Sequence, residues 1–175
     1  MDMKKAMEYE ETNLKLIQAF KKIVSNGNKI TVPSLCKEAN IHEQTFYKHF
    51  PSKDLFIEYA ITVRLENFYE TNKELSLPIF LELVIEACYN EKGHSSSNIQ
   101  DPFVKEKVYI ELEKIIKKKL NTTIFNNKNE GVIDFLAGGI IFYILNLMKF
   151  NLNSDEYRKS KQELLDITSK ISSII

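Results

Sequence analysis

The chain has 175 residues, of which 43% are hydrophobic, and its 24 basic and 24 acidic side chains cancel to a net charge of zero. This length suits a small module plus one larger domain with its own core, and it excludes a long array of domains. Only five glycines and four prolines, with no long alternating strand pattern, favour an all-α fold over a sheet protein.

The first predicted element is an amphipathic helix near the N-terminus. A polar segment extends to about Glu11, and an apolar stripe at helical spacing follows it. The stripe consists of Leu16, Ile17, Phe20, Ile23 and Val24. Asn26-Gly27-Asn28 is expected to end this helix.

Residues 31–53, TVPSLCKEANIHEQTFYKHFPSK, predict two short helices at a tight turn and the start of a third. Thr31 can cap the first helix, and Asn40 lies at the turn, where few residues besides Gly accept a left-handed backbone. Phe46 and Phe50 are four residues apart and are expected to point inward, which leaves polar side chains of the second helix free to face a partner. This spacing is typical of a helix-turn-helix.

The charge of this segment differs from that of the whole chain. Residues 12–53 contain seven lysines against two glutamates, an excess of five positive charges. A surface that faces phosphates needs such a local excess, although a solvated helix face also tolerates it, so this observation alone gives weak support.

Five further helices are predicted beyond residue 51. A long helix starts with Ser52 as its cap and runs to about Glu70, and an apolar helix covers 79–89. The pattern continues with helices over 102–124, 132–150 and 154–173.

The segment 135–148, FLAGGIIFYILNLM, is the one candidate for a membrane span. Its fourteen residues fall short of the roughly 20 needed to cross a bilayer, so we expect a core or interface helix and no membrane contact. The N-terminal residues lack the apolar region of a secretion signal, and we therefore expect a cytoplasmic protein.

The helix-turn-helix resembles the DNA-binding domain of the TetR (tetracycline repressor) family of bacterial regulators. The resemblance covers residues 12–60 and is carried by Thr31, by Ala39-Asn40-Ile41, by 45–50 (TFYKHF) and by 52–55 (SKDL). The family usually has Ala where this chain has Cys36 and Gly where it has Asn40. Both replacements fit physically, because Cys is small and readily buried and Asn accepts the backbone angle that Gly supplies.

By matching position, the resemblance implies a set of DNA contacts. Thr31, Tyr47, His49 and Lys53 have donors suited to phosphate oxygens, while Gln44, Thr45 and Lys48 are suited to base edges. Residues 1–53 would then form the DNA-binding domain, and residues 54–175 would form a helical regulatory and dimerisation domain. The implied function is that of a transcriptional regulator, with repression as the expected mode, which binds a near-palindromic operator as a homodimer.

The middle helices are expected to enclose a pocket for a small apolar effector that modulates DNA affinity. The residues proposed to line it are Arg64, Phe68, Phe80, Tyr89 and Tyr109. The same aromatic residues at helical spacing also suit a plain core. A co-regulator that keeps the fold but answers to a protein partner is the alternative.

An enzyme is the competing class, and the sequence gives it little support. It has no Gly-rich phosphate loop, GxSxG or HExxH, and the serines 95–97 beside His94 are not a triad by adjacency alone. Cys36 and Cys88 have no neighbouring His and no paired spacing. We therefore expect no catalysis, no metal and no cofactor.

Overall fold

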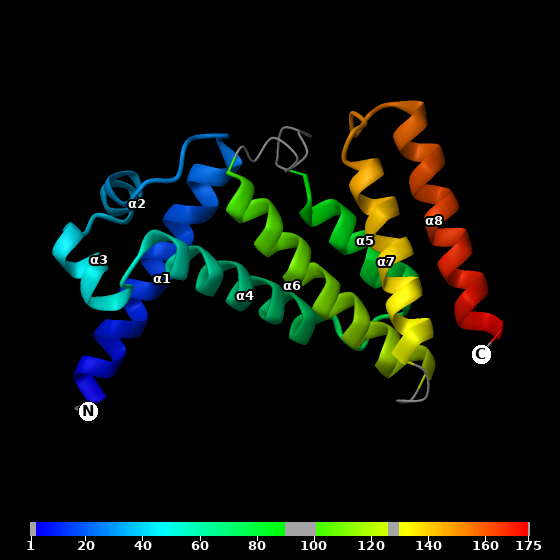
Figure 1. The fold of residues 1–175 in the computed structure, drawn as a ribbon, viewed down its shortest axis with the longest axis horizontal. Coiled ribbons are helices and arrows are strands. Elements are labelled where there is room, and N and C mark those ends of the chain that lie inside the picture. The colour runs from blue at the N-terminus through cyan, green and yellow to red at the C-terminus, as the bar shows by residue number, and fades with distance from the viewer. Residues whose placement is uncertain (1–2, 90–100, 126–129, 175) are drawn as a thin grey trace. The chain divides into compact units, whose positions relative to one another are not determined.

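The computed structural model describes residues 3–89, 101–125 and 130–174, and the regular elements of these residues are all helices (Figure 1). The all-α fold predicted from the sequence is confirmed. The elements are α1 (Met3–Ser25), α2 (Val32–Ala39), α3 (Glu43–His49), α4 (Lys53–Asn72), α5 (Leu77–Ala87), α6 (Pro102–Leu120), the π-helical turn η2 (Asn121–Phe125), α7 (Glu130–Leu147) and α8 (Asp155–Ile174). The predicted loop at 93–98, with His94, lies outside the described residues.

The helices group into two compact units. Unit 1 comprises Met1–Val63 with Ile99–Lys107, and unit 2 comprises Arg64–Asn98 with Val108–Ile175. By packing, unit 1 therefore extends past residue 53 into the first part of α4, where Phe56 lies in its core. Both α4 and α6 begin in unit 1 and end in unit 2.

Helix α1 begins well before the residue expected from the sequence. The polar segment up to Glu11 was expected to precede the helix, but the helix starts at Met3. The apolar stripe predicted only the part of α1 that packs on α2, with Leu16, Ala19 and Phe20 buried. Within this added part of the helix, Tyr9 contacts His49 of α3, as described below.

The core of unit 2 is formed by one face each of α5, α6, α7 and α8, together with Tyr69 from the last part of α4. Its members are nearly all aliphatic, with Phe80, Tyr69 and Tyr157 as the aromatic exceptions. One cation is buried beside them: Lys119 is 2% exposed and donates to the backbone carbonyls of Lys73 and Leu75, after α4. Those two acceptors satisfy a charge that would otherwise be costly to bury.

Helix α7 has two different apolar faces. Ile133, Ile140 and Ile144 lie on the face that is packed in the core, where α7 contacts α8. The other face is exposed and includes Phe135 and Phe142.

With 18 residues, α7 is long and apolar enough to cross a membrane by length and composition alone. The argument from a fourteen-residue segment therefore does not hold, and the absence of a membrane contact stays a prediction that rests on the packed face.

Candidate functional site

The helix-turn-helix is built from local interactions that fix where α2 starts. Thr31 is the N-cap of α2, and its Oγ1 accepts from the backbone N–H of Ser34 at 3.1 Å. Ser34 Oγ accepts in return from the N–H of Thr31 at 3.0 Å, which completes a capping box. The hydroxyl proton of Thr31 remains available, so the side chain can both cap α2 and donate to a phosphate.

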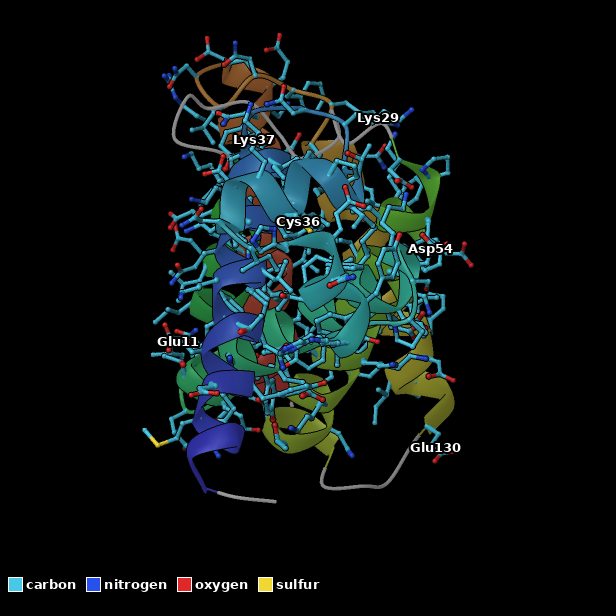
Figure 2. The ribbon with its side chains drawn as sticks, turned by 90° about the vertical axis from the view of Figure 1, so that its left-hand side faces the viewer. Glu11, Lys29, Cys36, Lys37, Asp54 and Glu130 are labelled. Carbon is cyan, nitrogen blue, oxygen red and sulfur yellow. The ribbon has the colours of Figure 1, made fainter. Side chains whose placement is uncertain are left out.

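The turn between α2 and α3 depends on Asn40. Its backbone lies in the left-handed region, at φ 54° and ψ 51°, and it is the one non-glycine residue with positive φ among those described. The N–H of Ile41 closes the end of α2 by donating to the carbonyl of Cys36 at 3.0 Å. The left-handed backbone predicted for Asn40 is thus confirmed. Figure 2 shows the buried Cys36 among the helices, while its neighbour Lys37 lies at the surface.

The buried face of α3 is aromatic. Phe46 is fully buried, and its ring lies 5.9 Å from that of Phe50 and 5.7 Å from that of Phe56. Phe20 of α1 joins the cluster through an edge contact with Phe56 at 5.9 Å. The inward orientation predicted for Phe46 and Phe50 is confirmed, and these four rings fix the rotation of α3 about its axis.

The opposite face of α3 is polar and exposed. Gln44 and Lys48 are exposed, Thr45 is half-buried, and Tyr47 is 53% exposed. The structure therefore brings together on one short helix the three residues predicted to reach base edges and the Tyr47 hydroxyl. Their amide, hydroxyl and ammonium groups are the kinds that pair with base edges and phosphates.

His49, at the end of α3, is more constrained than the sequence suggested. Its ring stacks on that of Tyr9 with centroids 4.0 Å apart, and its Nδ1 lies 2.8 Å from Oδ1 of Asn13. Burial lowers the pKa of His49, which favours the neutral ring. Because Oδ1 of Asn13 only accepts, Nδ1 donates to it, and Nε2 can therefore donate to a phosphate only when the ring is protonated. Sequence reasoning missed Tyr9 and Asn13, although both lie on the same face of α1 as the buried Leu16, at spacings of four and three residues along the helix.

Lys53, predicted to bind phosphate, is already paired. Its ammonium lies 3.1 Å from Oδ2 of Asp101 and 3.8 Å from Oδ1 of Asp54. Burial alone would raise the pKa of Asp101, but the hydrogen bond and charge of Lys53, together with the backbone N–H groups of Phe103 and Val104, outweigh it and lower that pKa. A phosphate that binds Lys53 must therefore compete with a carboxylate from the residue just before α6. Asp101 lies 48 residues away in sequence, and no local pattern points to it.

The residues proposed for an effector pocket fall into two groups in unit 2. Phe80 is fully buried with Phe68 packed against it at 5.5 Å, and the hydroxyl of Tyr89 donates to the carbonyl of Leu147 at 2.8 Å. Arg64 is exposed and Tyr109 is 41% exposed. The first three residues pack in or against the core of unit 2, whereas the other two are exposed, and a pocket shared by the five stays a prediction.

Comparisons with known proteins place this fold. No protein-family model and no curated protein matches the sequence. Among solved structures, Salmonella enterica GusR matches with a TM-score of 0.60 at 15% identity, over 93% of this chain and 95% of that one. The reduced form of E. coli NemR matches with a TM-score of 0.59 at 14% identity, over 91% and 97%. A transcriptional regulator of the TetR/AcrR family from Aquifex aeolicus VF5 matches with a TM-score of 0.56 at 21% identity, over 91% and 99%.

The chain has the TetR/AcrR regulator fold. At these identities the likeness concerns the path of the chain, and it spans both units rather than the helix-turn-helix alone. The fold implied by the resemblance over residues 12–60 is therefore confirmed for the whole chain.

Proposed function

We propose that the protein is a DNA-binding transcriptional regulator that acts as a homodimeric repressor on a near-palindromic operator. The observation that carries this proposal is the exposed polar face of α3, held in a helix-turn-helix by the rings of Phe46 and Phe50. In this motif the second helix enters the major groove, where an α-helix fits and where each base pair presents a distinct pattern. Occupancy of the operator is enough for repression.

Within this proposal the site residues divide by the chemistry of their free atoms. Gln44, Thr45 and Lys48 contact base edges and give sequence preference. Phosphate contacts come from the hydroxyls of Thr31 and Tyr47, from Nε2 of His49 when its ring is protonated, and from the ammonium of Lys53. Phosphate contacts set the register and the salt dependence of binding, so the two groups are separable by experiment.

The exposed face of α7 supports dimerisation. Phe135 is 80% exposed and Phe142 is 68% exposed, with Val132 and Leu145 also exposed on the same face. A Cβ added at Gly138 or Gly139 would meet nothing within 4 Å, so these glycines leave open space for a close neighbour. A second copy that applied the same face across a two-fold axis would cover it in a four-helix arrangement. Two α3 helices would then reach successive major grooves.

Control by a small apolar effector is proposed through α4 and α6, since each of these helices has residues in both units. An effector that binds one arrangement of the helices better changes DNA affinity by its differential affinity and no more. The core position of Phe80, with Phe68 packed against it, favours the second candidate, a regulator that answers to a protein partner instead. A screen of small apolar compounds by thermal shift and operator binding separates the two.

The test of the proposed function is selection from a library of random duplexes, followed by mobility-shift titration of the selected site and a reporter assay. We expect an inverted repeat to be enriched, and a reporter behind it to be less active when the protein is present. Failure to enrich any sequence, with no salt-dependent binding to any duplex, would overturn the proposal.

A further inference from the structure

The N-terminal part of α1 contacts the end of α3. Tyr9 and Asn13 are four residues apart and therefore lie on one face of α1. The ring of Tyr9 is stacked on His49, at 4.0 Å between centroids and 10° between planes, and its hydroxyl donates to the carbonyl of His49 at 3.4 Å. Asn13 is 8% exposed, and its Oδ1 lies 2.8 Å from Nδ1 of the same histidine.

These contacts supply a restraint that α3 lacks at its other end. The helix has only seven residues, and its N-cap, His42, makes no side-chain capping hydrogen bond. Phe46 and Phe50 fix the rotation of α3 about its axis, but rings on one side of a short helix leave its tilt less restrained. The contacts at His49 hold its ring plane, its Nδ1 and its carbonyl oxygen, and these together restrain the tilt.

We propose that Tyr9 and Asn13 are positioning residues for base recognition. They hold the end of α3 through His49, so that the adjacent Lys48 and, one turn earlier, Gln44 meet base edges at a fixed angle. This inference rests on the proposed DNA-binding function and adds residues of α1 to it. Paired hydrogen bonds to a base edge require defined geometry, whereas a long lysine side chain follows a phosphate through a small tilt. We call the contacts of Tyr9 and Asn13 with His49 the brace. Loss of the brace should therefore lower discrimination between DNA sequences more than it lowers affinity for DNA in general.

The experiment compares four full-length proteins on two duplexes. The proteins are the wild type, Tyr9→Ala, Tyr9→Phe and Met7→Ala, and the duplexes are the selected operator and a scrambled sequence of the same length. Phe keeps the stacked ring, and Met7 is 67% exposed on the same part of α1, so it serves as the matched control. Affinities are measured by fluorescence anisotropy at equal salt, and circular dichroism checks that each variant is folded.

Tyr9→Ala is expected to lower operator affinity by about two- to tenfold, since an aromatic pair contributes about that factor, while binding to the scrambled duplex stays within error. Tyr9→Phe, which loses only the long hydroxyl contact to the His49 carbonyl, is expected to lose less operator affinity than Tyr9→Ala, and Met7→Ala is expected to keep both affinities close to those of the wild type. Asn13→Ala leaves the ring stack in place and should also lower the ratio of operator affinity to scrambled-duplex affinity. This variant still tests the inference if Tyr9→Ala unfolds.

Two results would overturn the inference. Equal losses on both duplexes for Tyr9→Ala would mean that Tyr9 contacts phosphate itself, and an unchanged operator-to-scrambled ratio for both Tyr9→Ala and Asn13→Ala would mean that the brace does not position α3. A wild type that binds neither duplex would instead defeat the proposed function. In that case, amide hydrogen exchange still tests the brace without DNA, because Tyr9→Ala should speed exchange of the Phe46 and Phe50 N–H groups, which donate to the carbonyls of His42 and Phe46. Unchanged exchange would overturn the brace as well.

Discussion

Helices α3 and α7 each present an uncovered face, and the two faces have opposite chemistry. On α3 the exposed side chains are polar, with an amide at Gln44 and an ammonium at Lys48. On α7 the exposed side chains are apolar, led by Phe135 and Phe142. Polar side chains at a surface have no need of a partner, but a row of exposed aromatic and aliphatic groups is uncommon on a protein that stays alone in water.

This difference in chemistry indicates which kind of partner each face can bind. The face of α7 gains free energy from any apolar cover, so a second copy with the same face is enough. The face of α3 gains free energy only from a partner with matching donors, acceptors and charge, such as DNA. Dimerisation should therefore tolerate the replacement of one apolar residue on α7 by another, but a charged residue there should prevent it. DNA recognition should instead change when a single polar group on α3 is removed.

The largest expected effect comes from a charge on the α7 face. Phe142→Glu removes an aromatic ring from each side of the proposed interface and buries a carboxylate there, and we expect dimer affinity to fall by at least about 100-fold, from roughly 1.5–3 kcal/mol per buried ring. Analytical sedimentation over a range of protein concentrations measures the dimer affinity. Ile79→Glu on α5 is the matched control, because Ile79 is also about half exposed in unit 2. Dimers of Phe142→Glu as tight as those of the wild type would remove α7 from the interface.

On the α3 face a single amide is expected to matter nearly as much. Gln44→Ala removes the hydrogen bonds to one base edge and should cost about 1–3 kcal/mol on the preferred site. Repeating the selection with this variant should yield a site relaxed at one position in each half. Lys37→Ala, which removes a surface charge on α2, should return the original site. An unchanged site for Gln44→Ala would exclude base readout by this residue.

A smaller effect concerns the competition for Lys53. Asp101→Asn removes the carboxylate that pairs with Lys53 and so frees the Lys53 ammonium for a phosphate. Operator affinity should rise by about two- to fivefold, which matches the free energy of a partly exposed ion pair. Lys53→Ala should lower affinity on all sequences and reduce the salt slope by about one. Glu58→Gln is the control, because Glu58 pairs with Lys107 of α6 at 2.8 Å and leaves Lys53 unchanged. If Glu58→Gln had the same effect as Asp101→Asn, a looser α6 rather than a free Lys53 would be the cause.

The smallest effect is a pH dependence of stability from His49. Burial lowers its pKa in the folded state below the ordinary value of about 6.5, so the unfolded chain binds the proton more readily. The contribution to stability is therefore present above about pH 6.5 and is lost as the pH falls below it. The drop in melting temperature between pH 7.5 and 5.5 should be smaller in His49→Gln than in the wild type. An equal drop in both proteins would mean that His49 does not contribute this pH dependence.

The sequence predicted well those features that depend on neighbouring residues. The cap at Thr31, the left-handed Asn40 and the inward Phe46 and Phe50 follow from backbone sterics and helical spacing, and the structure has all four. Local rules also gave each later helix to within a few residues. They could not place the start of α1 at Met3, because polar residues there bear no apolar stripe to mark the helix.

The sequence predicted poorly whatever depends on distant partners. The contacts Tyr9–His49 and Lys53–Asp101 join residues 40 and 48 positions apart, and no spacing rule relates them. The pocket proposed in the middle helices stays a prediction, because it too depends on distant partners. Helical spacing identifies the inward face of a helix, but it does not say whether neighbouring side chains fill the space, as they do around Phe80.

The measurement that tests the central claim most directly is the stoichiometry and symmetry of the complex with selected DNA. Sedimentation of the protein on the selected duplex should give two protomers per site, and footprinting should place the half-site centres roughly 34 to 36 Å apart, one turn of the double helix. Phe142→Glu should lose this complex while an intact α3 still binds DNA weakly. A single protomer bound tightly to an asymmetric site would contradict the account, because the uncovered faces of α3 and α7 would then have no joint role.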